Sequence, residues 1–419
     1  MSNLLQHRIV TPKALRLRLL KWTPSQCISR TQIHGIALHG MAHSGIAQRG
    51  IALLPGRRLI ELQGQDAARF LQGLTTANIP SVNPAKPKAI YSAFLNAQGR
   101  LLQDVFIYHM PLDSRLISPI SSQHHTGGED QRFLIEVDGG QLDNLVSWLK
   151  AHKLRTKVSL RPLPPGEINV ISAWNDSISS DEMSEGAAGL QDEDFIVLPD
   201  NRAPGFGLRV LSRGGYLPAV FEGVQSFKAE DAQAEQQYTL RRYAFGIPEG
   251  EKELVHQTAL VQESNIDYMG GVDFQKGCYV GQELVIRTQH TGVVRKRILP
   301  CVLYKSGEPQ PDNIEFNADM TGLVANGTEI KSSAVEGEKV KKGGTWLAGI
   351  GNFGLAICRL QDMAGLAAAG DIGKARKPHE WNIDRTRNPG MDDLKVMPIV
   401  PGWWRKRAPQ SAFKDVVYA

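Results

Sequence analysis

Apolar and polar positions alternate along the chain with two different periods, and together they predict an α+β region in its first part. Residues 58–62 alternate between polar and apolar side chains, which predicts a strand, and the short, largely apolar runs at residues 133–137, 157–163, 168–174, 195–198 and 208–211 are also predicted to be strands. Runs with a period near 3.6 predict helices, and these are residues 65–74, 142–150 and 232–245. Strands that follow one another and are interspersed with a few helices are typical of a sheet covered by helices on one face.

Turn-forming residues predict where several of these elements begin and end. Residues 91–109 contain two apolar runs around Asn96-Ala97-Gln98-Gly99, and Gly99 can supply the positive φ of a tight turn, which predicts a β-hairpin. Asp66 stands where it can cap the first helix, and Gly246-Ile247-Pro248 ends the third. The polar residues 111–131 and the acidic, Ser/Gly-rich residues 175–194 are predicted to be loops, and the second of these is expected to have no function.

Beyond residue 294 the pattern changes to short strands separated by glycine and proline. The predicted strands are residues 299–304, 328–330, 346–351, 355–359 and 396–400. Such a series predicts a small β-barrel or sandwich. Residues 306–345 are predicted to be a long polar insertion and residues 408–419 a loose tail.

Length and composition indicate a globular protein of two or three domains. The chain has 419 residues, of which 42% are hydrophobic and 22% charged. No apolar run approaches the roughly 18 residues that a membrane-spanning helix needs, so we expect no membrane insertion. The four cysteines form no C-x-x-C pair, which argues against a disulfide scaffold or a self-contained metal site. Two of them, Cys301 and Cys358, lie in apolar strands and are predicted to be buried.

The N-terminal segment has the composition of a mitochondrial presequence. The first sixty residues hold nine Lys or Arg and no acid before Glu61, and leucines and hydroxyl-bearing residues are interspersed among the basic ones. A secretory signal would need an uninterrupted apolar segment, and a disordered basic tail is the remaining alternative. We therefore expect residues 1–50 to be a removable presequence and the mature protein to reside in the mitochondrial matrix.

This segment also accounts for the basic charge of the chain. Residues 1–50 contain seven of the 48 basic residues and none of the 43 acidic ones, so the formal charge changes from +5 to −2 without them. Nucleic-acid binding needs a basic surface on the folded part of a protein. We therefore expect no direct nucleic-acid partner.

The most distinctive candidate for chemistry is the octet Lys276-Gly277-Cys278-Tyr279-Val280-Gly281-Gln282-Glu283. Its glycines allow a sharp turn or a close approach, because they carry no Cβ. An ammonium on Lys276 would favour the reactive thiolate of Cys278. The alternative is that Cys278 is a buried apolar residue, as free cysteines often are. The polar neighbours favour a functional loop.

This octet resembles the signature of the YgfZ/GcvT family, in which the fold of the glycine-cleavage T-protein serves iron-sulfur protein maturation. The resemblance extends to most of the chain after residue 51, including residues 91–108, 263–265, 292–297 and 403–404. It implies two intertwined α+β halves over residues 51–294, a C-terminal β-barrel over 295–407 and a tail over 408–419.

The resemblance also implies a function: a matrix assembly factor that matures 4Fe-4S proteins such as aconitase and lipoate synthase together with A-type scaffold proteins. A cluster generally needs four protein ligands, and no second cysteine lies near Cys278 in the sequence. Cys278 would therefore be one ligand of a shared iron-sulfur cluster, with the others supplied by a partner or a small thiol. Gln282 and Glu283 would orient their neighbours through hydrogen bonds.

The alternative within the same family is a folate-dependent one-carbon transferase. The T-protein has two acids in its early hairpin and a glutamate that contacts the pterin, whereas this chain has Gln103-Asp104 and the segment Arg242-Tyr243-Ala244-Phe245-Gly246. Both departures argue against catalysis, because proton transfer and pterin recognition need a placed carboxylate. A tetrahydrofolate pocket without turnover remains an option, and its candidate residues are Asp104, Arg241 and Glu263.

Overall fold

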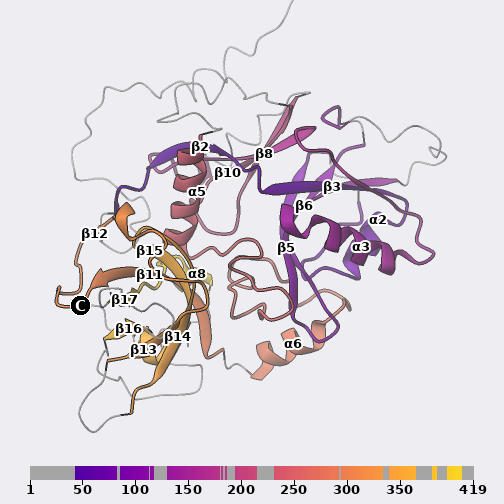
Figure 1. Cartoon of the computed structure of the whole chain (residues 1–419). Helices are drawn as coiled ribbons and strands as arrows, with labels where there is room; N and C mark the ends of the chain where they lie inside the picture. The colour runs from indigo at the N-terminus through magenta and orange to yellow at the C-terminus, as the bar shows by residue number, and fades with distance from the viewer. Residues whose placement is uncertain are drawn as a thin grey trace, which may run out of the picture.

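The computed structural model describes residues 43–82, 85–112, 114–117, 130–179, 181–182, 185, 194–214, 231–291, 294–333, 339–364, 380–384 and 394–407. Two large sheets and a closed barrel make up this part of the chain, and the barrel lies at the opposite side of the molecule from the sheet that carries the first hairpin (Figure 1). Among the helices of these residues, none has both the length and the apolar character needed to cross a membrane.

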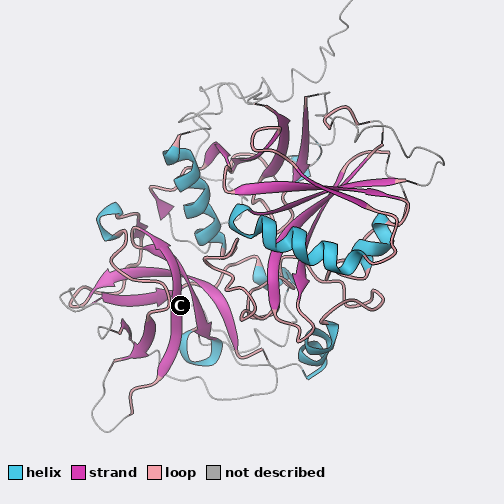
Figure 2. Ribbon diagram, turned by 45° about the vertical axis from the view of Figure 1, so that its right-hand side comes forward, coloured by secondary structure: helices cyan, strands magenta, loops and turns pink. Residues whose placement is uncertain are grey.

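The first sheet has five antiparallel strands in the order β4-β5-β6-β3-β7. Their bounds are Arg57–Gly64 for β3, Lys88–Leu95 for β4, Leu101–Met110 for β5, Gln131–Asp138 for β6 and Ser159–Pro162 for β7. All ten positions of β5 are buried, because alternate side chains enter two different cores. Val105 and Ile107 pack with the apolar faces of α2 (Ala67–Gln72) and α3 (Leu142–Lys153), whereas Phe106 and Tyr108 enter the core shared with the second sheet. Figure 2 shows α3 lying along one face of this sheet.

The second sheet has four strands in the order β2-β8-β10-β9. Their bounds are Arg49–Leu53 for β2, Ile168–Asn175 for β8, Phe195–Pro199 for β9 and Leu208–Arg213 for β10. Helix α5 (Ala232–Phe245) contacts both β2 and the barrel, so it connects the two. It ends at Gly246, whose φ of 68° lies in the left-handed region that glycine adopts without strain.

The barrel closes in the order β11-β15-β14-β13-β16-β17. Its strands are β11 Lys296–Lys305, β13 Glu329–Ser332, β14 Lys342–Ile350, β15 Phe353–Arg359, β16 Trp381–Ile383 and β17 Leu394–Pro398. Short elements accompany it: β1 His43–Ser44 paired with β12 Ile314–Glu315, and helices α7 Leu360–Met363 and α8 Trp404–Arg407. The indole of Trp403 donates a 2.9 Å hydrogen bond to the carbonyl of Phe245, which fastens the end of the barrel domain to the end of α5.

A buried network of charged side chains joins the two sheets. Glu136 on β6 accepts from Arg57 at 2.7 Å and lies 3.1 Å from Arg209 on β10. Arg209 and Arg202 both contact Glu249, at 2.8 and 2.6 Å. Each of these side chains is at most 7% exposed. The pKa of Glu249 is well below its usual range, because the attraction of the surrounding guanidinium groups outweighs its burial.

Most of the predicted elements are confirmed, including the hairpin around Gly99, the bounds of α5 and the α+β region followed by a barrel. The predicted cap was wrong, because the Asp66 carboxylate accepts from the Lys157 amide at 2.8 Å and makes no cap to α2. The polar insertion predicted at residues 306–345 was drawn too long, since β12, β13 and the start of β14 lie within it, β13 at the strand predicted for residues 328–330.

Several predictions concern residues that the structure does not describe or describes only in part. Residues 1–42, 186–193 and 408–419 lie outside the described residues, so the presequence, much of the acidic loop and the tail stay predictions. The described structure begins before residue 51, with β1 at His43 and β2 at Arg49. The sequence pattern did not predict helix α6 (Gln282–Thr291), which follows the octet directly.

Candidate functional site

The octet forms an exposed loop that leads into α6, beside the turn of the β4–β5 hairpin (Figure 1). Cys278 is exposed, as are its neighbour Gly277 and the preceding Gln275. Phe274 is 38% exposed, and among the large apolar side chains that are exposed in the described residues it is the aromatic one. The structure therefore places the thiol of Cys278 on the surface and not in the core.

Lys276 fastens this loop to the segment that follows α2. Its ammonium donates to the main-chain carbonyls of Gln72, Thr75 and Ala77, at 2.9, 2.6 and 2.8 Å. An ammonium has three N–H donors, so all of them are used by these carbonyls. Burial lowers the pKa of Lys276 to about 8. The sequence suggested that the Lys276 ammonium favours the thiolate of Cys278, but its hydrogen bonds go to main-chain carbonyls. Lys276 therefore holds the loop in place.

Main-chain hydrogen bonds on both sides of Cys278 add to this attachment. The amide of Asp273 donates to the carbonyl of Thr76 at 2.9 Å, and the amide of Val280 donates to the carbonyl of Gly73 at 3.1 Å. The Thr76 hydroxyl donates to the carbonyl of Gly271 at 2.5 Å. The loop is therefore bound along its length to residues 72–77, and no sequence pattern connects these two segments.

The two glycines of the octet have different roles. Gly281 has a φ of +80°, and a Cβ there would overlap the Asn96 carbonyl and come within 2.9 Å of Leu95. Gly99 in the hairpin turn has a φ of +76°, and a Cβ there would come within 2.8 Å of the Gly281 carbonyl. The absence of side chains at both positions therefore allows the hairpin turn and the start of α6 to pack directly. Gly277 has open space around it, with nothing within 4 Å of a Cβ.

The remaining members of the octet stabilise the turn into α6. Tyr279 is buried, and this burial raises its pKa to about 12. The side-chain carbonyl of Gln282 accepts from the Tyr279 amide at 3.3 Å, which is the orienting role expected of Gln282. Glu283 is exposed in the first turn of α6, where the partial positive charge of a helix N-terminus favours a carboxylate.

Cys278 differs from the other cysteines that the structure describes. Cys301 and Cys358 are fully buried in the barrel, with their sulfur atoms 3.9 Å apart, which confirms their predicted burial. Burial also raises the pKa of the Cys301 thiol well above its usual value. Across the described ranges, no three His, Cys, Asp or Glu side chains are grouped so that they could hold a metal ion. Of the described thiols, Cys278 is the one that solvent and a second molecule can reach.

The three candidate folate residues lie in separate environments. Asp104 is 2% exposed, accepts from the Gly250 amide at 3.0 Å and lies 3.7 Å from Arg57, and burial raises its pKa. Arg241 is buried and uses its guanidinium on Asp176 and on the carbonyls of Gly205 and Phe206.

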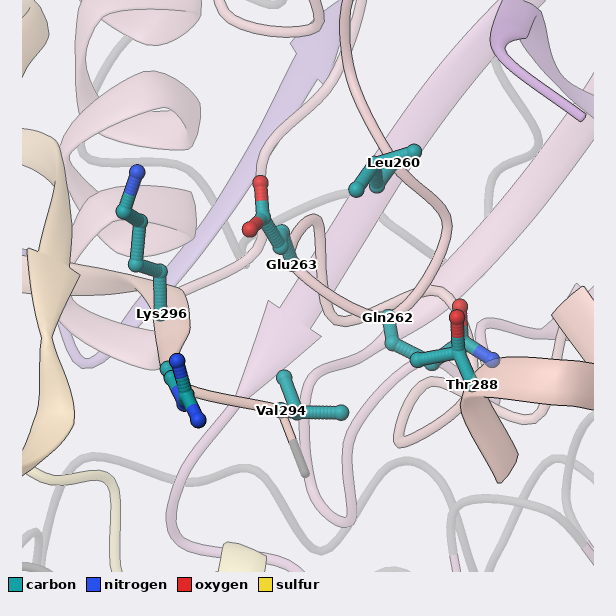
Figure 3. Close-up of a pocket in the computed structure, with 7 residues that line it drawn as sticks. Leu260, Gln262, Glu263, Thr288, Val294 and Lys296 are labelled. Carbon is teal, nitrogen blue, oxygen red and sulfur yellow. The ribbon is translucent and has the colours of Figure 1, made fainter. Parts of the chain in front are cut away.

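Glu263 is half-buried and lines a cavity near Lys296 (Figure 3). Among the described residues, no hydrogen bond or ion pair joins any two of these three. One carboxylate oxygen of Asp104, Oδ2, is buried and has no hydrogen-bond partner among the described residues. The three residues therefore belong to separate sets of contacts, and a tetrahydrofolate pocket that includes them stays a prediction.

Comparison with known proteins finds relatives that all carry the same name. No protein-family model matches the chain. It is 39% identical over 367 residues to the iron-sulfur cluster assembly factor IBA57 homolog, mitochondrial, of Coccidioides immitis, an alignment that covers 84% of this chain and 82% of the relative. The protein of the same name from Pyricularia oryzae is 40% identical over 365 residues, with 84% of each chain covered. That from Chaetomium globosum is 40% identical over 342 residues, covering 77% of this chain and 74% of the relative.

The fold has a counterpart among solved structures. The crystal structure of the glycine cleavage system aminomethyltransferase T from Bartonella henselae matches with a TM-score of 0.54, covering 86% of this chain and 87% of that one. The two sequences are 11% identical, so this likeness concerns the fold alone. It confirms the T-protein-like fold that the octet implied.

Proposed function

This chain belongs to the family of mitochondrial iron-sulfur cluster assembly factors named IBA57, and from that premise we propose that it matures 4Fe-4S proteins in the mitochondrial matrix. Cys278 supplies one thiolate to a cluster that is cargo and not a resident cofactor. An A-type scaffold protein supplies the other ligands. The recipients are 4Fe-4S apoproteins of the aconitase and lipoate synthase type.

One observation carries the proposal: Cys278, the one exposed thiol among the described residues, is held on a loop whose neighbours leave it uncovered. Gly277 contributes no side chain beside Cys278 and has open space around it. A cluster generally needs four ligands, and the described residues contain no group of three that could supply the rest. The arrangement therefore suits a cluster bridged between two proteins better than one enclosed by this chain.

The anchored loop also determines what this chain contributes chemically. A cysteine binds iron as a thiolate, so the thiol loses its proton to solvent or to the partner as the sulfur–iron bond forms. Lys276, Gly281 and the main-chain bonds to residues 73 and 76 fix the loop before the partner arrives. Less conformational entropy is then lost on binding than a mobile loop would lose.

The folate-dependent transferase gains no specific support. Ala244 occupies the position where the family resemblance places a pterin-contacting glutamate, and it is 5% exposed on α5. Asp104, the single acid of the hairpin, is engaged by Gly250 and Arg57. A general base has to reach the proton that it removes, and these contacts hold the Asp104 carboxylate inside the protein.

The test is anaerobic reconstitution of the full chain with iron, sulfide and an A-type scaffold protein, followed by visible absorption and circular dichroism of the cluster. We expect a new cluster signal that needs both proteins and disappears in Cys278→Ser. The matched control is Gln275→Ser, an exposed neighbour whose side chain lies on the same loop; it should keep the signal. An unchanged signal in Cys278→Ser would show that this thiol is not a ligand.

A further inference from the structure

A cavity of about 320 Å³ lies at the junction between the α+β region and the barrel. It is lined by Leu260, Gln262, Glu263, Thr288, Val294, Arg295 and Lys296. This volume is at the lower end of the roughly 300–1,000 Å³ that is usual for small-molecule sites. The lining comes from three segments: the turns after residue 259, the last part of α6, and the residues that lead into β11 together with its first residue.

The walls of the cavity are held by contacts that leave its charged groups available. Gln262 is 3% exposed. Its side-chain amide donates to the main-chain carbonyl of Val285 on α6 at 2.8 Å, and its main-chain carbonyl accepts from the guanidinium of Arg297 at 2.6 Å. The carbonyl of Glu263 accepts from the Ile298 amide at 2.9 Å. Arg297 itself is neutralised by Asp267 through two 2.8 Å hydrogen bonds. These bonds are made by the main chain or by neighbouring side chains, so the Glu263 carboxylate is not used in them.

The charges of the lining are of both signs and are not paired with each other. Figure 3 shows Lys296 on one side of Glu263, and Gln262 with Thr288 on the other. In the part of the chain that the structure describes, the side chains of Glu263, Arg295 and Lys296 have no ion pair within 4.0 Å. Partial burial raises the pKa of Glu263, and the positive charge of Lys296 opposes this rise most strongly, followed by those of Arg100 and Arg297. The cavity thus presents one half-buried carboxylate and, at its rim, two exposed cations, and none of the three is in an ion pair among the described residues.

We propose that this cavity binds a small amino acid or peptide that carries one ammonium and two carboxylates. The ammonium pairs with Glu263, and the two carboxylates pair with Arg295 and Lys296. The net charge of such a ligand, −1, complements the net charge of the lining, +1. Leu260 and Val294 provide apolar surface for its methylene groups. The proposal concerns a site separate from Cys278.

The probe is S-methylglutathione, a tripeptide with this set of charges whose blocked sulfur cannot react with Cys278. Its affinity for the full chain is measured by isothermal titration at low salt. We expect Glu263→Gln to weaken binding about tenfold, because a charge-assisted hydrogen bond is lost. N-acetylation of the probe removes the ammonium and should weaken binding to the wild type equally, with no further loss in Glu263→Gln.

Two further measurements make the outcome decisive. Lys296→Met should also weaken binding, whereas Lys305→Met, an exposed lysine at the far end of β11, should not. No binding at millimolar probe, or independent effects of N-acetylation and Glu263→Gln, would overturn the proposal. The proposal would also be overturned if tetrahydrofolate bound here and its binding were weakened by Lys296→Met but unchanged by Glu263→Gln. The glutamate tail of folate has two carboxylates and no ammonium, so that pattern would identify folate as the ligand.

Discussion

Replacing Lys276 by methionine tests whether this lysine holds the loop or activates the thiol. Methionine keeps an unbranched apolar side chain of similar length, so the main loss is the ammonium. The carbonyls of Gln72, Thr75 and Ala77 then lose donors at 2.9, 2.6 and 2.8 Å. All three carbonyls belong to the segment on which the Cys278 loop rests.

The expected cost is smaller than three separate hydrogen bonds. A hydrogen bond to a charged group contributes about 1.5–3 kcal/mol. Here one ammonium serves three acceptors, and Lys276 is only half-buried, so water replaces part of what is lost. We expect Lys276→Met to lower the free energy of unfolding by about 2–4 kcal/mol. Lys305→Met is the control, because Lys305 is exposed at the end of β11.

Three measurements on the full chain separate the two roles. Urea denaturation gives the free energy of unfolding. Hydrogen exchange at the amides of Asp273 and Val280, which donate to Thr76 and Gly73, reports whether the loop opens. Alkylation of Cys278 by iodoacetamide as a function of pH reports on the thiolate. If Lys276 holds the loop, stability falls and both amides exchange faster, while the pH profile of alkylation stays where it is.

The opposite pattern would refute this reasoning. An ammonium that activates the thiol stabilises the thiolate electrostatically, typically by about one pH unit or more for a close opposite charge. Lys276→Met would then move the alkylation profile to higher pH and leave the unfolding free energy and both exchange rates unchanged.

Two further predictions concern the same loop. Gly281→Ala should lower the free energy of unfolding by about 2–4 kcal/mol, because its φ of +80° disfavours a side chain and the new Cβ would overlap Asn96. The control Gly277→Ala should change the free energy of unfolding by less than about 0.5 kcal/mol. Equal urea midpoints for the two variants would contradict this prediction. The pKa of Lys276 is about 8 in the folded protein and 10.5 without burial, so between these values the unfolded chain binds more protons. The pH-dependent part of the contribution of Lys276 to stability should therefore rise with pH across this window and be lost as pH falls through about 8, where the hydrogen bonds of the ammonium to residues 72, 75 and 77 remain. A wild-type advantage over Lys276→Met that shrinks from pH 8 to pH 10 would be inconsistent with this reasoning.

The elements that sequence predicts well are those whose signals are local. Gly99 and Gly246 both adopt a positive φ, so the hairpin turn and the end of α5 are encoded at single positions. Helix α6 begins without a Ser, Thr, Asp or Asn cap and follows a glycine, which is why its start was not recognised. Asp66 offered a cap, but the strand that follows α3 brings the Lys157 amide to its carboxylate instead.

The sequence indicated the octet as a candidate site but not the contacts that its residues make. The octet identified Cys278, whose exposure suits a ligand. The partners of Lys276 are main-chain carbonyls about two hundred positions earlier in the chain, and a carbonyl leaves no mark on the sequence. For the same reason the contact between Gly99 and Gly281 was invisible, although each glycine was noted by itself.

The charged network between the sheets determines how this protein unfolds. Separating Glu136 on β6 from Arg209 on β10 would break this ion pair and expose to water the apolar core that the two sheets share, which includes Phe106 and Leu211. A form with one sheet folded and the other detached would bear this cost without the entropy of a disordered chain. The two halves are therefore expected to melt in a single cooperative transition.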